Sequence, residues 1–100
     1  MNELLKLSNN ELINNIRVRR AHYALTRGHV WKRPPIIYVN IYQAAFEMRD
    51  AVCKTSLGLA KWLECLIEIM GILGGNNVAL RAKPNHWIIA ATMCWEENQQ

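Results

Sequence analysis

The segment 8–27 shows a helical spacing of apolar positions behind an N-terminal cap. Ser8 and Glu11 stand three residues apart, as the two members of a capping box do. Gly28 suits the position just after a helix end, so one helix is predicted from Ser8 to about Arg27. At about 100° per residue, one face of that helix collects apolar and basic residues together. That face holds Leu12, Ile13, Ile16, Arg20, Tyr23, Ala24 and Arg27, with Arg17 at its edge.

The segment after Pro34-Pro35 supports two interpretations. The run IIYVNIY is β-branched and aromatic, which favours a strand when the run is taken alone. When the segment is followed to Lys54, its apolar residues fall on one helical face and its polar residues on another. A helical pattern over residues 37–54 outweighs the strand preference of the short run, so a helix is predicted. The apolar face holds Ile37, Ile41, Ala44, Ala45, Met48 and Val52.

A third helix is predicted from a cap at Thr55 or Ser56 to the pair Gly74-Gly75. Its few polar positions form one narrow stripe, and apolar side chains cover the rest of its surface. A helix that is apolar on nearly all sides lies at the centre of a fold or in an interface. We therefore expect either a central helix or pairing with a second copy of the chain. The residues expected at an oligomer interface are Trp62, Leu66, Ile69, Met70 and Leu73.

The last quarter, residues 78–97, has an alternating apolar pattern that a hairpin would also produce. Pro84 and Asn85 suit the middle of a turn, and Asn85 equally suits the cap of a fourth helix. A fourth helix fits the otherwise helical pattern better. The predicted fold is therefore mainly α: a single-domain bundle of three to four helices over residues 1–97, with a frayed tail at 98–100.

Composition agrees with a folded globule, since 51% of the residues are hydrophobic and 20% are charged. The basic charge is concentrated at one end, because residues 1–33 hold seven of the 12 Lys and Arg but two of the eight acids. A local basic surface indicates an acidic partner. The three cysteines lie apart in apolar runs, as buried free thiols do. We expect a reducing compartment and a cytoplasmic protein, with no signal peptide and no membrane-spanning segment.

The chain contains no motif for catalysis or for a cofactor. None of the cysteines neighbours a histidine in sequence, and His22 and His29 lack the acids or cysteines that would complete a metal site. The glycines of GILGGNN lack the Lys-Ser/Thr pair of a phosphate-binding loop, and a helix end accounts for them. We expect a protein that is not an enzyme and that holds neither a metal nor a cofactor.

The basic stretch 14–35 is the candidate contact surface. Arginine binds phosphate or carboxylate, and arginine, tyrosine and tryptophan also dominate protein interfaces. Because Arg20 and Arg27 occupy the predicted apolar face, a merely solvated helix explains them poorly. We predict a small non-catalytic binding or regulatory module, of inhibitor or adaptor type, that docks on an acidic protein surface. The alternative is a nucleic-acid-binding regulator that uses the same patch on phosphates. The predicted partner-binding residues are Arg17, Arg20, Tyr23, Arg27, His29, Trp31, Lys32 and Arg33.

Overall fold

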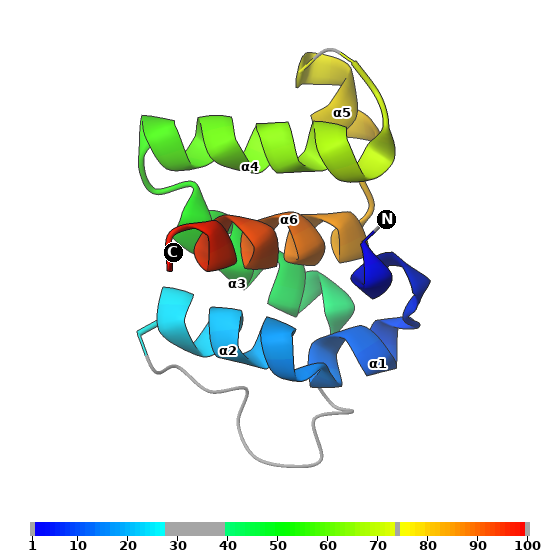
Figure 1. The fold of residues 1–100 in the computed structure, drawn as a ribbon, viewed down its shortest axis with the longest axis vertical. Helices are drawn as coiled ribbons and strands as arrows, with labels where there is room; N and C mark the ends of the chain where they lie inside the picture. Colours follow the sequence, from blue (N-terminus) through cyan, green and yellow to red (C-terminus); the bar gives the residue numbers. More distant parts are fainter. Residues whose placement is uncertain (1, 28–39, 74, 100) are drawn as a thin grey trace.

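The computed structural model describes residues 2–27, 40–73 and 75–99 (Figure 1). Over these residues the backbone is mainly α-helical and contains no strand, so the predicted fold class is confirmed. Residues 78–97 belong to two helices, Gly75–Arg81 and Pro84–Glu97, which excludes the alternative of a hairpin and divides the predicted fourth helix at residues 82–83. The elements are η1 (Glu3–Lys6, a 3-10 helix), α1 (Asn9–Asn14), α2 (Ile16–Leu25), α3 (Ile41–Val52), α4 (Ser56–Met70), α5 (Gly75–Arg81) and α6 (Pro84–Glu97).

Helix α6 runs through the middle of the bundle (Figure 1). It packs against α2, α3 and α4, and every position from Ile88 to Thr92 is buried. Consecutive buried positions require neighbours on all sides of a helix. The third predicted helix, which is α4, was expected either at the centre of the fold or in an interface. The centre is occupied by α6 instead. Helix α4 covers one side of α6 and leaves Leu57 and Leu59 exposed.

The predicted single helix over residues 8–27 is interrupted at Asn15. The capping box is present as expected: the Glu11 N–H donates to Ser8 Oγ, and the Ser8 N–H donates to Glu11 Oε1. Asn15 has extended backbone angles and ends α1. Its Oδ1 accepts a hydrogen bond from the Arg17 N–H at 2.9 Å, so its side chain also caps α2.

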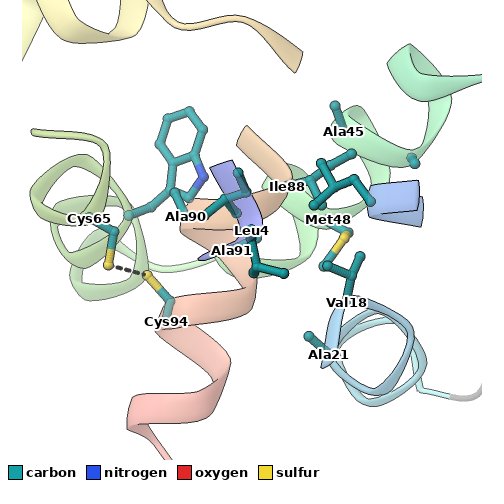
Figure 2. Packing of buried hydrophobic residues seen from close by; sticks show 14 of the residues in the cluster. Leu4, Val18, Ala21, Ala45, Met48, Cys65, Ile88, Ala90, Ala91 and Cys94 are labelled. Carbon is teal, nitrogen blue, oxygen red and sulfur yellow. Dashed lines mark hydrogen bonds between the residues drawn. The ribbon is translucent and has the colours of Figure 1, made fainter. Parts of the chain in front are cut away.

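This break reverses the face that α2 presents to the core. Leu12 and Ile13 are buried from α1, as expected, but α2 buries Val18 and Ala21 (Figure 2). On a continuous helix, Val18 and Ala21 would lie about half a turn away from Leu12 and Ile13. The residues predicted beside Leu12, such as Ile16, therefore face outward. The prediction that the face with Ile16 packs against the core was therefore wrong, and the opposite face of α2, with Val18 and Ala21, is the buried one.

Three other helix ends differ from the predictions. Helix α3 begins at Ile41 behind an Asn40 cap, later than the predicted pattern. Helix α4 ends at Gly71, whose φ of 66° is left-handed, rather than at residues 74–75. Helix α6 begins at Pro84, which suits a first helical position, so Asn85 is not its cap.

The hydrophobic core lies between α6 and the helices around it (Figure 2). Met48 of α3, Leu66 of α4 and Ile88 of α6 are fully buried, and the apolar face predicted for α3 is confirmed at Ala44 and Ala45. Each such aliphatic side chain contributes about 1.5–3 kcal/mol on burial. Among the described residues, none of the helices combines the length and the apolar character that crossing a bilayer requires.

Candidate functional site

The outward side of α2 is the candidate contact surface, and we call it the α2 face. Helix α2 itself lies on the side of the bundle away from α4 (Figure 1). Ile16 is 60% exposed and Tyr23 is 56% exposed, although side chains of this size are usually covered. Exposed arginines stand between and beyond them along the helix. The α2 face consists of Ile16, Arg19, Arg20, Tyr23, Ala24 and Arg27.

A surface hollow of about 580 Å³ opens on the α2 face. Ile16, Tyr23 and Arg20 line it from α2, and Trp95 lines it from α6. The hollow therefore combines apolar walls with guanidinium groups. Such a site can take an apolar side chain while the arginines bind carboxylates or phosphates around it.

His22 also lines the hollow, although its side chain is only 2% exposed. Its Nε2 lies 3.1 Å from Glu47 Oε1 of α3, in hydrogen-bonding distance. A buried imidazole needs such a partner, and this contact joins α2 to α3 beneath the α2 face. His22 thus supports the position of the surface rather than contributing an exposed group to it.

Arg17, which was predicted to bind a partner, is held within the chain. Its Nε and Nη2 donate to Glu96 Oε2 and Oε1 at 2.8 and 2.7 Å, so the pair is bidentate. The hydrogen bond from Arg17 lowers the pKa of the Glu96 carboxyl, and the same bond raises the pKa of the guanidinium. Glu96 stands near the C-terminal end of α6, where the helix dipole disfavours a negative charge, and its carboxylate is paired with Arg17 there. The ion pair ties the start of α2 to the end of α6.

Arg27 lies just beyond the end of α2 in an unusual backbone conformation. Its φ of 56° falls in the left-handed region, which favours glycine. The sequence predicted that Gly28 would follow the helix end, but α2 ends at Leu25 with Thr26 as its cap. An exposed arginine therefore occupies the position at which a glycine would have cost less.

The predicted set of partner-binding residues is thus divided. Arg20, Tyr23 and Arg27 are exposed on or next to α2, whereas Arg17 is bound to Glu96. The other four predicted residues lie outside the described part of the chain: His29, Trp31, Lys32 and Arg33.

The predicted oligomer interface is also divided by the fold. Trp62 is 4% exposed and Leu66 is fully buried, so both belong to the core of one chain and are out of reach of a second copy. Ile69 and Met70 pack partly against that core. Leu73, which is 91% exposed, is the member of the set that a second copy would reach most easily.

The sequence analysis missed three residues of this surface. It placed Ile16 on the apolar face of the first helix and left Arg19 and Trp95 out of the predicted partner-binding residues, whereas all three line the hollow. Asn15 could have indicated the break, because asparagine is a strong helix N-cap. It stands directly before the residues that were assigned to the wrong side of the helix.

In the part of the chain that the structure describes, no group of three or more His, Cys, Asp or Glu side chains is placed to hold a metal ion. Comparison of the chain with protein-family models, with curated proteins and with solved structures gave no match.

Proposed function

We propose that this chain is a small non-catalytic binding module that docks on an acidic protein surface through the α2 face. The observation that carries the proposal is the exposure of Ile16 and Tyr23 among arginines, beside an open hollow. A helix face that only meets water does not need large apolar side chains. A protein interface needs both an apolar centre and a polar rim.

The mixture of groups favours protein over nucleic acid as the partner. Phosphates would bind Arg19, Arg20 and Arg27, but they would leave Ile16 without a role. An acidic segment of a protein can bind the arginines through carboxylates and place an apolar side chain in the hollow. Tyrosine and arginine are also the residue types in which interface binding energy concentrates.

The first experiment captures partners on the immobilised chain from a cell lysate, with and without nuclease. We expect a partner protein that stays bound to the immobilised chain after nuclease treatment. The double variant Arg20→Glu/Arg27→Glu should lose it, because two of the three arginines of the α2 face are reversed in charge. The matched control is Lys54→Glu/Arg81→Glu, which makes the same change of net charge at exposed positions outside the α2 face. If both double variants lose the partner equally, the contact depends on net charge and not on this face.

A second measurement separates the alternative of nucleic-acid binding. Ile16→Ser and Tyr23→Ala should weaken binding to the captured protein by about tenfold or more. Binding to phosphates would tolerate Ile16→Ser, and its affinity would fall with salt at a log–log slope of about −3 for three phosphate contacts. A partner that is lost on nuclease treatment, with such a slope, would favour the nucleic-acid alternative.

Pairing of two copies through α4 remains a prediction of the sequence. Exposed Leu57, Leu59 and Leu73 on or next to this helix support it. A monomeric mass at micromolar concentration, measured by sedimentation or light scattering, would contradict it.

A further inference from the structure

Two thiols face each other inside the bundle, one from α4 and one from α6. Cys65 and Cys94 are 4% and 3% exposed, and their sulfur atoms lie 3.4 Å apart (Figure 2). The two residues are free cysteines, 29 positions apart in the chain. A disulfide has its sulfurs about 2 Å apart, so bond formation needs an approach of little more than about 1 Å.

The two thiols differ in their chemistry. The hydrogen bond between the two sulfur atoms, in which either thiol can be the donor, raises the pKa of the Cys65 thiol and lowers the pKa of the Cys94 thiol. Burial and the carboxylates of Glu97 and Glu64 oppose the Cys94 thiolate, while the nearby Lys61 ammonium favours it. Cys94 lines a hollow that opens to the surface and Cys65 does not, so Cys94 is the residue that a reagent reaches first. The attacking form of this residue is the thiolate. Glu97 Oε2 lies 3.6 Å from the Cys65 sulfur, where it can accept the proton that Cys65 gives up.

Cys94 can be reached from the surface through a second hollow. This hollow has a volume of about 250 Å³, and its walls include Cys94, Lys61 and Trp95. That volume is below the roughly 300–1,000 Å³ of ordinary ligand pockets, so it admits a small molecule.

We propose that Cys94 and Cys65 form a redox-modification site that takes a low-molecular-weight disulfide such as oxidised glutathione. The Cys94 thiolate attacks one sulfur of the reagent, a mixed disulfide forms, and the first small thiolate leaves. Cys65 loses its proton and attacks the Cys94 sulfur, which releases the second small thiolate. The two cysteines are oxidised to one disulfide, and the reagent is reduced to two thiols. The product bond joins α4 to α6.

The site does not rest on the proposed docking function, since it uses none of the residues of the α2 face. Its test treats the purified, folded chain with oxidised glutathione, traps the remaining thiols, and reads the products by mass spectrometry. We expect the wild type to lose the mass of two hydrogens and to yield a linked peptide pair containing Cys65 and Cys94.

Cysteine variants identify the order of the steps. Cys65→Ser should stop at one glutathione on Cys94, because the second thiol is gone. Cys94→Ser should form neither that adduct nor a disulfide. Cys53→Ser is the matched control, since it removes the third, half-buried cysteine and should react as the wild type does.

If Cys65→Ser and Cys94→Ser do not fold, Cys53→Ser still tests the proposal, because it leaves the Cys65–Cys94 pair intact. The proposal is overturned if folded Cys53→Ser keeps both thiols while the urea-unfolded chain is oxidised. It is equally overturned if the wild type links Cys53 to Cys94, or if the adduct of Cys65→Ser lies on Cys53.

Discussion

Replacing Asn15 by alanine tests the break that turns the α2 face outward. The substitution removes the side-chain cap of α2 and leaves the backbone bond from the Asn15 N–H to the Leu12 carbonyl. Alanine is also the best helix former, so on propensity alone it would favour one continuous helix. If local preference decided the phase of the helix, Asn15→Ala would stabilise the chain.

The structure predicts the opposite sign. One hydrogen bond of 2.9 Å, from the Arg17 N–H to Asn15 Oδ1, is lost. Loss of an N-cap of this kind costs about 1 kcal/mol. Forming one continuous helix would not recover this loss of stability, because it would rotate the buried Val18 and Ala21 out of the core. For a domain of this size, about 1 kcal/mol lowers the melting temperature by about 4–8 °C.

The assay is thermal and urea unfolding followed by far-UV circular dichroism, in wild type and variant. Asn15→Asp is the matched control, because it keeps an acceptor oxygen and adds a charge that the N-terminus of α2 favours. We expect the control to unfold within about 0.5 kcal/mol of the wild type. A melting temperature of Asn15→Ala at or above that of the wild type would refute the reasoning.

Four further predictions follow from particular contacts and can be checked by the same unfolding assay. Arg27→Gly should stabilise the chain by about 1 kcal/mol, because glycine adopts the left-handed backbone at φ 56° without strain. Glu96→Gln should cost up to about 1 kcal/mol at neutral pH, since the pair with Arg17 is partly exposed. That difference should vanish as the pH falls through the lowered pKa of Glu96, because the folded state then loses the charge it stabilised. Gly58→Ala should cost about 2 kcal/mol, because the new Cβ would overlap the backbone at the end of α3. Oxidation to the disulfide between α4 and α6 should raise the free energy of unfolding by about 3.5 kcal/mol, from the 29-residue separation of its cysteines.

The helical nature of the described chain followed from local patterns. The capping box at Ser8 and the buried face of α3 at Ala44, Ala45 and Met48 were predicted and are confirmed. These features depend on residues within a few positions of each other. Propensity, capping and spacing act over that same range, so a sequence can show them.

The candidate site was only partly predictable, and the reason lies in one residue. The arginines and the tyrosine of α2 were identified as a contact surface, but they were expected to replace apolar residues along the core stripe. The extended backbone of Asn15 turned that stripe outward and buried Val18 instead. A spacing of about 100° per residue carries phase only while the helix is unbroken.

What the sequence determined by itself is the mainly helical fold class, the concentration of basic charge in the first third of the chain, and the residue types available for contact. What the tertiary structure alone decided is which side chains meet. The bidentate bonds of Arg17 to Glu96 span 79 positions, and the thiol pair of Cys65 and Cys94 spans 29. Neither pairing leaves a local signal, because each arises only when α6 is enclosed by α2 and α4. Long-range contacts of this kind depend on which helix faces pack together, and the packing of the whole core determines those faces.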